Sequence, residues 1–514
     1  AETPEIGNTA FDQLIPRILE EQNIAVDTVA GATVTSNALI AGVSDAITMA
    51  GGKLEDFTKA PAKDDTPAQT LEYTADVVVI GSGAAGLSAA IEARAAGASV
   101  IVLEKLPHIG GNTYICGGYI YGTGSAYQSS KGFTDDSPAA LVEYWQERAE
   151  GMADEALLTF VAENSGDTID FLVSNGVEFG DPIACGTSPV LRGLRSPTGG
   201  VGLIMPIEKA AREAGAEILL NTRATALILE DGVIKGVTAE SGKDTVHVYA
   251  PAVVLATGGY DASAEMLAAY SPTVAGQKSR SSPGNIGDGI AIAESVNAAF
   301  SFRDGYIGTT AIPDVGYRDP INKRFNNVLA VTAEGSRFVN EAVDYPLYHR
   351  AMTDTGSGAF FQIFDAGLQP EGLDNALASG AAFQGATLEE LAASAGIDAA
   401  ALTATVNRYN ELCEAGGDAD FGKSADKLLS IGEPPFYALK IAPVTIGSIG
   451  GVKINVNAQV LDENGAEIPG FFAAGAVANG DFFYQTYPAS GTSICMSFTF
   501  GRTAGTNAAA FALK

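Results

Sequence analysis

Histidine and cysteine, which bind most transition metals in proteins, are scarce in this sequence. Its 514 residues include three histidines and four cysteines. The cysteines, Cys116, Cys185, Cys413 and Cys495, lie far apart and form no C-x-x-C pair. Zinc, haem and iron–sulfur centres need ligands of these types at close spacing, so we expect none of them.

Basic residues and long apolar runs are also in short supply. Lys and Arg number 30 against 61 Asp and Glu, a net charge of −31. Such a charge argues against nucleic acid or an anionic membrane as a partner. It either keeps the surface soluble or attracts a small cationic redox protein. No apolar run reaches the roughly 18–20 residues of a membrane span, and no signal-peptide pattern is visible. We therefore expect a soluble, already processed piece.

Glycine, by contrast, is abundant, and the chain divides into parts. The 60 glycines indicate tight turns and close approach to a ligand. The length suggests about three domains. Residues 56–72 contain Pro and charged residues without apolar periodicity, which is typical of a linker. The linker separates a short segment, residues 1–55, from the main body.

The body opens with ADVVVIGSGAAGLSAAIEARAAGASVIVLEK, a strand–turn–helix–strand pattern. Gly81, Gly83 and Gly86 occupy the turn, and Glu104 ends the second strand. In dinucleotide-binding folds such glycines let the backbone approach a pyrophosphate, and such a carboxylate binds ribose hydroxyls. The pattern predicts an α/β, Rossmann-like domain.

Three later features favour FAD over NAD. A second glycine turn, GGNT at residues 110–113, follows the second strand closely. Residues 217–256 alternate like a β-meander and end in VVLATGG. FFAAGAVANG, residues 471–480, repeats a strand-to-glycine turn far downstream. A chain that returns to its first nucleotide fold suits FAD, whose isoalloxazine lies far from its adenine.

Several stretches together resemble one family. VIGSGAAGLSAA, GGNT, VVLATGGYD, GDGIAIA, GSRFVNE, PGFFAAG and FTFGRTAG look like the fumarate reductase flavoprotein superfamily. This group includes flavocytochrome fumarate reductases, urocanate reductases and 3-ketosteroid Δ1-dehydrogenases. The resemblance implies a Rossmann-like FAD domain, residues 73–308 and 437–514, interrupted by a mobile α+β capping domain, residues 309–436. Substrate would be enclosed between cap and flavin.

The motifs and the resemblance imply further contacts with FAD. These are Lys105, Gly111, Asn112, Thr113, Gly118, Thr257, Gly258, Asp288, Gly475, Gly491 and Ser493. Asp288 is expected to cap a helix near the flavin.

The first segment contains VDTVAGATVTSNAL, which resembles the flavinylation motif of FMN-binding domains. The resemblance implies FMN on Thr35, eight residues after Asp27, through a phosphoester. Two features depart from the pattern: Ala30 stands where serine is commoner, and residues 1–55 resemble only the second half of such a domain. The alternative is a helix N-terminus capped by Thr or Ser.

In GSRFVNE, Arg337 matches the arginine that donates the proton in fumarate reductases. An arginine is a poor acid, with a pKa above about 12, so it needs a dry site and a relay. Arg324 matches the relay arginine, but Ile321 replaces the expected relay glutamate. The alternatives are a salt bridge from Arg337 to Glu341 on a surface helix and a solvated Arg324.

The substrate-binding side departs most from the dicarboxylate reductases. Gly447 and Ser448 stand where those enzymes have a histidine and a threonine, and Tyr487-Pro488 replaces their arginine segment. A second carboxylate would then be buried without a partner, at a cost of several kcal/mol. Fumarate is therefore not the expected substrate.

YPASGT instead resembles the ketosteroid dehydrogenase segment in which tyrosine and glycine polarise a ketone oxygen. By this match the Tyr487 hydroxyl and the Gly491 N–H form an oxyanion-type pocket. Tyr119 or Tyr121 faces the same space. Phe482, Phe483 and Tyr484 supply a flat apolar wall, unless these aromatics are ordinary core. His349 is either part of the cap's structure or a substrate contact, and His108 is expected to be a loop residue beside the cofactor.

The sequence thus predicts an FAD-dependent reductase of an activated C=C bond, in an aromatic or bulky apolar enone or enoate. Electrons would arrive through FMN from a donor protein or a membrane redox chain. The alternatives are Δ1-type dehydrogenation of a cyclic ketone and a non-catalytic electron-transfer flavoprotein. Because FMN domains of this kind are often exported, we expect an extracytoplasmic location.

Overall fold

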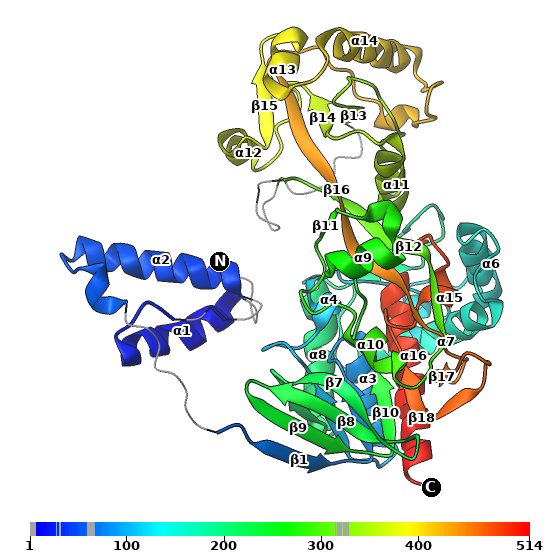
Figure 1. Ribbon diagram of the computed structural model, residues 1–514. Coiled ribbons are helices and arrows are strands. Elements are labelled where there is room, and N and C mark those ends of the chain that lie inside the picture. Colours follow the sequence, from blue (N-terminus) through cyan, green and yellow to red (C-terminus); the bar gives the residue numbers. More distant parts are fainter. Residues whose placement is uncertain are drawn as a thin grey trace.

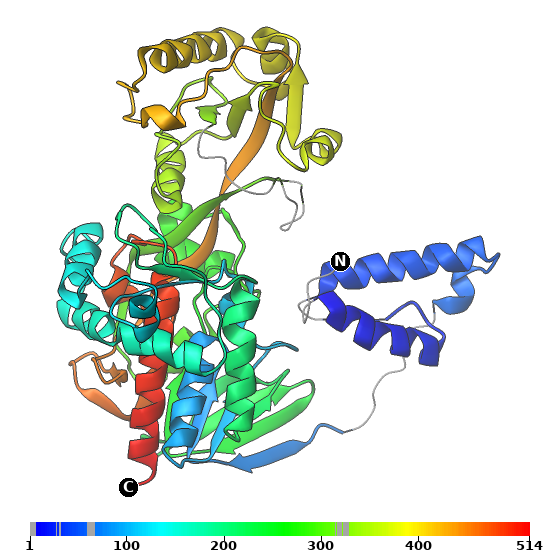
Figure 2. The ribbon, with the colours of Figure 1, turned by 180° about the vertical axis from the view of Figure 1, so that it is seen from behind.

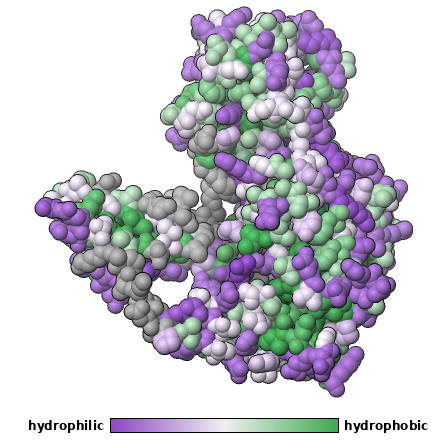
Figure 3. All heavy atoms as spheres, in the orientation of Figure 1, coloured by the Kyte–Doolittle hydropathy of each residue, from purple (hydrophilic) through white to green (hydrophobic). Residues whose placement is uncertain are grey.

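The computed structural model describes residues 7–26, 28–29, 32–58, 67–313, 315, 321 and 328–514. At the N-terminal end, α1 (Gly7–Glu21) and α2 (Thr33–Met49) form a pair with an apolar core of its own, followed by a 3-10 turn, Leu54–Phe57. Figure 3 shows hydrophobic residues gathered on this pair, flanked by hydrophilic ones.

The central sheet of the FAD domain has six strands. In spatial order they are β17 (Gln459–Leu461), β18 (Glu467–Ala473), β10 (Ala252–Leu255), β2 (Val77–Ile80), β3 (Val100–Leu103) and β6 (Glu217–Leu219). All neighbours are parallel except β17 and β18. All four residues of β2, VVVI, are buried, as expected for a strand covered on both faces.

Helices cover this sheet. They are α3 (Ala84–Ala95), α8 (Gly200–Glu213) and the long C-terminal α16 (Thr492–Ala512). Helix α16 packs very close to α3 because it carries glycines at the contact. A Cβ atom at Gly505 would lie 2.1 Å from the carbonyl oxygen of Ala89, so no larger residue fits there. The small-residue sequence of both helices thus determines how they pack.

A second sheet lies beside the first, in the order β1 (Thr70–Thr74), β9 (Asp244–Tyr249), β8 (Val233–Ser241) and β7 (Arg223–Glu230). The predicted meander is therefore shorter than expected, because β6 and β10 join the parallel sheet instead. Strand β1 begins inside the segment interpreted as a linker and pairs in parallel with β9, from Thr70↔Thr245 to Thr74↔Tyr249.

Two long strands, β12 (Phe300–Ala311) and β16 (Phe436–Val452), connect the FAD domain to the cap. They pair antiparallel from Phe300↔Val452 to Ala311↔Ala442. Figures 1 and 2 show β16 rising from the FAD domain into the cap. The chain thus enters and leaves the cap on adjacent strands, which explains how one domain interrupts the other.

In the cap, β16 also pairs with β14 (Phe360–Phe364) and β15 (Ala382–Gly385), and β14 pairs with β13 (Leu329–Thr332). The cap helices are α11 (Tyr345–Thr355), α12 (Leu373–Ser379), α13 (Leu388–Ala395) and α14 (Ala399–Ala415). Apolar residues fill two cores, one on each side of this sheet.

The remaining elements surround the FAD domain, apart from one 3-10 turn in the cap. They are α4 (Gly111–Ile115), β4 (Tyr119–Tyr121), α5 (Ala126–Ser130), α6 (Pro138–Arg148), α7 (Glu155–Ser174), β5 (Gly193–Arg195), α9 (Ala264–Tyr270), β11 (Lys278–Ser279), α10 (Asp288–Glu294), α15 (Gly480–Phe483) and the 3-10 turns Pro272–Val274 and Ala425–Lys427. Within the described ranges, no helix combines the length and apolar character needed to cross a membrane.

Candidate active site

A cavity of about 590 Å³ lies where several strands of the central sheet end. The residues that follow β2, β3, β10 and β18 line it, together with part of β16 and the first turn of α16. In open α/β sheets ligands bind beyond the carboxyl ends of the strands. The predicted cofactor residues that line the cavity are Gly81, Gly83, Glu104, Lys105, Gly111, Asn112, Thr113, Thr257, Gly258, Asp288, Gly475, Gly491 and Ser493.

The glycines of the first turn are required by backbone packing. Gly81 has a φ of +106°, and a Cβ there would lie 2.3 Å from the carbonyl oxygen of Ala256. A Cβ at Gly86 would lie 1.8 Å from the carbonyl oxygen of Gly81, so α3 could not reach β2. Gly86 is outside the cavity lining, and so is Gly118, where a Cβ would lie 2.5 Å from Gly199. Both positions act through packing.

Glu104 is buried at the end of β3. Its carboxylate accepts hydrogen bonds from the Ser82 hydroxyl at 2.5 Å and from the Leu106 N–H at 2.8 Å. Next to it, Lys105 Nζ lies 2.7 Å from Asp288 Oδ2. Burial alone would raise the pKa of Asp288, but hydrogen bonds from Arg223 and Lys105 outweigh it and hold that pKa below its usual value. Asp288 begins α10, although the N-cap residue is Gly287.

These residues fit FAD. The Thr257 hydroxyl is buried at the cavity wall, and no hydrogen-bond partner for it is present in the described chain. Asn112 is fixed between two segments, accepting from the Ser282 N–H at 2.6 Å and donating to the Ile446 carbonyl at 3.5 Å. The glycine turn and Glu104 would hold the nucleotide half, and Asn112, Thr257 and the first turn of α16 the flavin half.

Tyr487 lies at the flavin end, 5% exposed, next to the first turn of α16. Its hydroxyl oxygen accepts the Ser493 N–H at 3.2 Å, and the Gly491 N–H also points at it. Burial raises the pKa of Tyr487, and these N–H groups offset only part of that rise. The predicted oxyanion-type pair of Tyr487 and Gly491 stays a prediction. The phenol proton is left to donate elsewhere.

Tyr345, which the sequence analysis did not single out, also lines the cavity. It is the first residue of α11 in the cap, and its ring lies 6.4 Å from that of Tyr487 between centroids. Burial of its hydroxyl raises the pKa of Tyr345 well above 10, and a hydrogen bond with Ser490 opposes this rise. The sequence signal that could have pointed to Tyr345 is YPLYHR, in which a tyrosine precedes a proline at the start of a helix.

Most of the aromatic residues predicted to form a wall of the site do not line the cavity. Tyr119 lines the cavity, but Tyr121, Phe482, Phe483 and Tyr484 do not. Phe482 and Phe483 are buried, with the Phe482 ring 5.3 Å from that of Trp145. The apolar part of the wall comes instead from Ile115, Ile307, Ile446 and Ile494. Phe482 and Phe483 belong to the core because the short α15, which contains both, turns their side chains inward.

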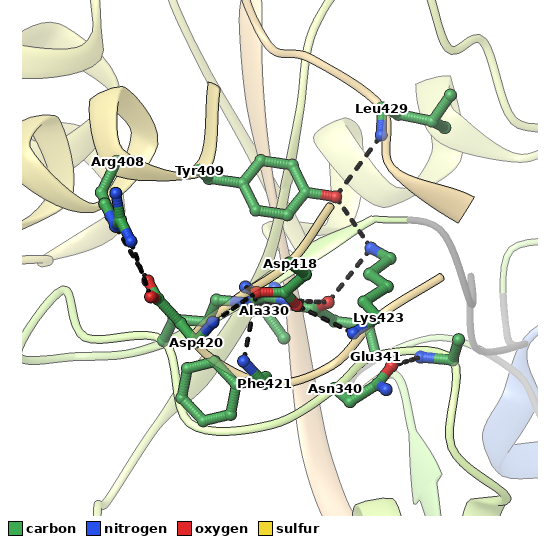
Figure 4. A network of polar contacts seen from close by, with 12 residues as sticks. Ala330, Asn340, Glu341, Arg408, Tyr409, Asp418, Asp420, Phe421, Lys423 and Leu429 are labelled. Atoms are coloured by element: carbon green, nitrogen blue, oxygen red, sulfur yellow. Dashed lines mark hydrogen bonds and ion pairs between the residues drawn. The ribbon is translucent and has the colours of Figure 1, made fainter. Parts of the chain in front are cut away.

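Arg337 lies in the cap and does not line the cavity. Its Nε donates to Glu341 at 2.8 Å and its Nη2 to Asp418 at 2.8 Å, with the guanidinium 5.0 Å from the Tyr409 ring centre. Figure 4 labels Glu341, Asp418 and Tyr409, the partners of Arg337, together with Lys423, whose Nζ lies 3.0 Å from Glu341 Oε2. Of the alternative, the salt bridge to Glu341 is present, but the surface helix is wrong, because the side chain of Arg337 is 6% exposed and no helix spans these residues. Its role as proton donor stays a prediction, and Arg324 lies outside the described residues.

The two histidines that the sequence analysis singled out, His349 and His108, both contact protein groups outside the cavity. His349 is fully buried, with Nε2 2.8 Å from the Gln277 Oε1, and it does not line the cavity. His108 Nδ1 lies 3.3 Å from the Ile109 carbonyl in the loop after β3.

Thr35 lies in the first turn of α2, 8% exposed, in a shallow groove with apolar lining. The N-cap is Ala32, and it makes no side-chain hydrogen bond, so the alternative of a Thr or Ser cap is wrong. Ser36 instead accepts the Val29 N–H at 3.0 Å. A helix N-terminus attracts phosphate, so the place of Thr35 in the first turn of α2 is compatible with the predicted FMN attachment, which stays a prediction. Asp27 and Ala30 lie outside the described residues.

Fold and cavity together define a flavin-dependent oxidoreductase. The family model described as FAD binding domain matches residues 76–494, and the one described as FMN-binding domain matches residues 1–48. The chain belongs to the FAD binding domain family and, within it, to the fumarate reductase flavoprotein superfamily. FAD and FMN are its cofactors. It is an FAD-dependent oxidoreductase that acts on carbon–carbon bonds.

Its similarity to individual proteins is extensive. It is 33% identical over 462 residues to a fumarate reductase (cytochrome) of Shewanella frigidimarina, covering 86% of this chain and 78% of that one. It is 32% identical over 529 residues to a urocanate reductase of Eggerthella lenta, covering 99% and 86%.

Two solved structures are also similar. The first is the open conformation of a flavocytochrome c3 fumarate reductase, with a TM-score of 0.74, 31% identity, and coverage of 89% of this chain and 84% of that one. The second is a 3-ketosteroid-Δ4-(5α)-dehydrogenase from Rhodococcus jostii RHA1 in complex with 4-androstene-3,17-dione. There the TM-score is 0.71, the identity 28%, and the coverage 87% and 99%.

Proposed function

We propose that this protein reduces an activated C=C bond in an apolar or aromatic enone or enoate. The observation that carries the proposal is the Tyr487 hydroxyl, which receives the Ser493 N–H in a partly apolar cavity that the neighbouring Tyr345, 6.4 Å away between ring centroids, also lines. A phenol whose oxygen already accepts hydrogen bonds is a better donor to a carbonyl or carboxylate oxygen.

The reaction adds two electrons and two hydrogens across the double bond. When bound and reduced, FAD would supply the hydride for the carbon β to the electron-withdrawing group, and a side chain of the protein supplies the proton to the α-carbon. Tyr487 polarises the acceptor oxygen, so that negative charge develops where the first turn of α16 also favours it. The Tyr144 hydroxyl donates to the Pro488 carbonyl at 2.8 Å and positions this segment.

The proton comes from the cap. Tyr345 is the cap phenol that already lines the cavity, whereas Arg337 would have to move into it. Such a movement is compatible with the description of the flavocytochrome relative as an open conformation. The cap also keeps water from the reacting atoms, which strengthens every polar contact there.

Thr35 would hold FMN, which would pass electrons on to FAD from an electron-donor protein or a membrane redox chain outside the cytoplasm. The apolar groove beside Thr35, lined by Leu39, Val43 and Ile47, suits an isoalloxazine ring.

A second candidate is dehydrogenation of a cyclic ketone. Its support is the same pair of phenols, Tyr487 and Tyr345, together with the similarity to a ketosteroid dehydrogenase. A third candidate, an electron-transfer flavoprotein without a substrate, leaves these phenols without a role.

Anaerobic reoxidation distinguishes the three. The dithionite-reduced holoprotein is mixed with fumarate, urocanate, cinnamate, a Δ4-3-ketosteroid or a one-electron dye, and the flavin spectrum is followed. Rapid reoxidation by cinnamate but not fumarate is the expected result. Reoxidation by the dye alone contradicts the proposal. Reduction of the oxidised protein by the ketosteroid favours the dehydrogenase.

A further inference from the structure

The segment that leads to Tyr487, residues 481–487, contains one residue with a strained backbone. Tyr484, which follows α15, has a φ of +61° and a ψ of −99°. Glycine adopts this combination readily, whereas a residue with a side chain rarely does. Such a conformation persists only where the surrounding structure holds it, and it is commonest at functional sites. The contacts that hold Tyr484 therefore also fix the backbone shortly before Tyr487.

These contacts come from a bulge in β12. The register of β12 against β16 shifts between Phe302 and Gly305, so Arg303 and Asp304 lie in a bulge between two regular stretches. Asp304 has a φ of +56°, which adds to the local kink. Bulges re-aim side chains and are frequent beside active sites. Here the bulge brings Arg303 to the segment 481–487.

Arg303 contacts three residues of this segment. Its Nη2 donates to Asp481 Oδ1 at 3.0 Å, and its guanidinium carbon lies 5.7 Å from the centre of the Tyr484 ring. Its backbone carbonyl accepts a hydrogen bond from Gln485 Nε2 at 2.6 Å. Asp481 is held from a second side, because the Ser301 hydroxyl also donates to its Oδ1, at 2.7 Å. The ion pair, the cation–π contact and the amide hydrogen bond together fix the segment on both sides of Tyr484.

The strand and the segment are in direct contact. A Cβ atom at Gly305 would lie 2.9 Å from the Tyr484 carbonyl oxygen, so no larger residue fits there. Beyond Gln485 the chain reaches Tyr487, whose hydroxyl accepts the Ser493 N–H at 3.2 Å. A shift of the segment would therefore move the Tyr487 hydroxyl relative to the first turn of α16 and to the cavity.

We propose that Arg303 and Gln485 are positioning residues that fix the direction of the Tyr487 hydroxyl. Neither residue is among those that line the cavity, so they act through Tyr487 rather than on the substrate. The proposal rests on the proposed function, in which this hydroxyl polarises the acceptor oxygen. A donor in such a site is effective only when it is already aimed at the charge that develops.

The test uses Gln485→Leu and Arg303→Gln in the holoprotein, with Arg502→Gln as the matched control. Gln485→Leu removes the amide donor and keeps a side chain of similar size. Arg303→Gln removes the ion pair and the cation–π contact but keeps the backbone carbonyl. Arg502 also combines a carboxylate and a ring, with Nε 2.7 Å from Glu92 Oε1 and the guanidinium carbon 4.7 Å from the centre of the Phe171 ring, and it does not line the cavity.

Three quantities are measured. The first is the single-turnover rate of flavin reoxidation by cinnamate, with Tyr487 intact and in a Tyr487→Phe background. The second is the Kd of the saturated acid, 3-phenylpropanoate, from the flavin spectrum of the oxidised protein. The third is amide hydrogen exchange at Ser493, whose N–H donates to the Tyr487 hydroxyl. This exchange reports where the hydroxyl lies without any turnover.

In Gln485→Leu we expect the rate to fall about tenfold, less than the roughly 100-fold that a misplacement of about 1 Å can cost. The Ser493 amide should exchange faster by a similar factor, because its N–H loses a fixed acceptor. The Kd should change less than about threefold, because the hydroxyl acts chiefly on the transition state. Arg303→Gln should have a smaller effect of the same kind, and Arg502→Gln should match the unaltered protein.

The Tyr487→Phe background separates positioning from a purely structural role. There Gln485→Leu should change the rate less than about twofold, because the hydroxyl that it positions is absent. Equal losses in both backgrounds would overturn the proposal, since a purely structural role does not depend on that hydroxyl. Unchanged exchange at Ser493 in Gln485→Leu would overturn it too.

The two proposals fail differently. If exchange at Ser493 responds to Gln485→Leu but no alkene reoxidises the flavin of the unaltered protein, the proposed reduction is wrong and the positioning role stands. If cinnamate reoxidises the flavin and neither variant changes the rate or the exchange at Ser493, the reduction stands and the positioning role is wrong.

Discussion

The flavin cavity and the buried cluster around Arg337 differ in how their polar groups are satisfied. In the cluster, Arg337 and Lys423 are matched by Glu341 and Asp418, and all four side chains are almost fully buried. In the cavity, Tyr487 and Tyr345 are neutral phenols, the first accepting the Ser493 N–H and the second hydrogen-bonded to the Ser490 side chain. The first region satisfies its charges internally, whereas the second keeps donors facing a space that substrate can enter.

The difference bears on proton transfer. Burial alone would lower the pKa of Arg337, but hydrogen bonds to Glu341 and Asp418 outweigh it and raise that pKa further. A guanidinium held in this way is a worse acid than one in water. The phenols need no charge separation within the cap to donate a hydrogen bond. The cap cluster therefore fits a stabilising role, and the variants below test whether Arg337 or Tyr345 donates the proton.

The largest expected effect comes from Arg337→Met. The substitution leaves Glu341 and Asp418 buried without their guanidinium, and breaking a buried pair costs about 3–5 kcal/mol. We expect hydrogen exchange of β13 and α14 to accelerate accordingly, while the FAD domain stays protected. Arg408→Gln is the matched control, because Arg408 lies on α14 and also contacts two carboxylates, Asp420 and Glu411, but in solvent.

Arg337→Lys tests most directly whether Arg337 stabilises the cap or donates the proton. A lysine that preserves cap protection but abolishes reoxidation by cinnamate, while Kd values stay unchanged, would mean that Arg337 is the proton donor after all. Loss of protection and turnover together would support the stabilising role.

His349, near the junction of cap and FAD domain, should make stability depend on pH. Its Nε2–H donates to Gln277, and its buried Nδ1 meets no described acceptor, so a second proton is disfavoured. Burial lowers the pKa of His349 to about 4 from 6.5. Between these values the unfolded chain binds a proton that the folded one does not. Stability is therefore present above pH 6.5 and falls as the pH drops toward 4, by about 3 kcal/mol.

The measurement is the unfolding midpoint of the unaltered protein and His349→Gln from pH 7.5 to 4.5. Carboxylates also titrate over this pH range, in both proteins alike. The informative quantity is therefore the difference in unfolding midpoint between the unaltered protein and the variant. The unaltered protein should lose more stability on acidification than the variant. Parallel curves would mean that the buried ring is protonated in the folded state.

The nucleotide end of the cavity could be predicted because its signals are local. The glycine turn, Glu104, GGNT and Thr257-Gly258 each follow a buried strand, and parallel strands bring their carboxyl ends to one edge. The family and the interruption by a cap followed from the order of such motifs. Periodicity alone assigned β6 and β10 to a meander, because alternation does not say which strand becomes a neighbour.

The cap could not be predicted to the same degree because its contacts are long-range. Arg337 and Asp418 are 81 residues apart, and nothing near GSRFVNE points to GGDADF. Tyr345 reaches Tyr487 only through the way α11 is placed over the cavity. Arg303 lies in a bulge without a motif, and its pairing with Asp481 depends on the course of β12. Side-chain roles that depend on such pairings require the fold.

Tyr487→Phe should reduce turnover by about 100-fold, since removal of one donor from an oxyanion-type site costs on the order of 10²–10³ in kcat. The Ser493 N–H would lose its acceptor, but α16 and the FAD contacts should persist, so the flavin spectrum should not change. The readout is the single-turnover rate of flavin reoxidation by cinnamate. A changed Kd for 3-phenylpropanoate with an unchanged rate would mean that Tyr487 only shapes the cavity.

The smallest effect should come from Tyr345→Phe. Water or Arg337 can take over as proton source from Tyr345, whereas nothing replaces the fixed hydrogen bond that Tyr487 donates. We expect a loss of about tenfold, at the lower edge of the general acid contribution. The ring of Tyr345 remains in the variant, so its packing near Tyr487 is kept and the change isolates the hydroxyl. If the hydroxyl donates the proton, the solvent deuterium isotope effect on single-turnover reoxidation should change between the two proteins. An unchanged rate and an unchanged isotope effect would mean that Tyr345 is not the proton donor. Arg337 of the cap cluster would then be the donor, and it would have to leave its two carboxylate partners to reach the substrate.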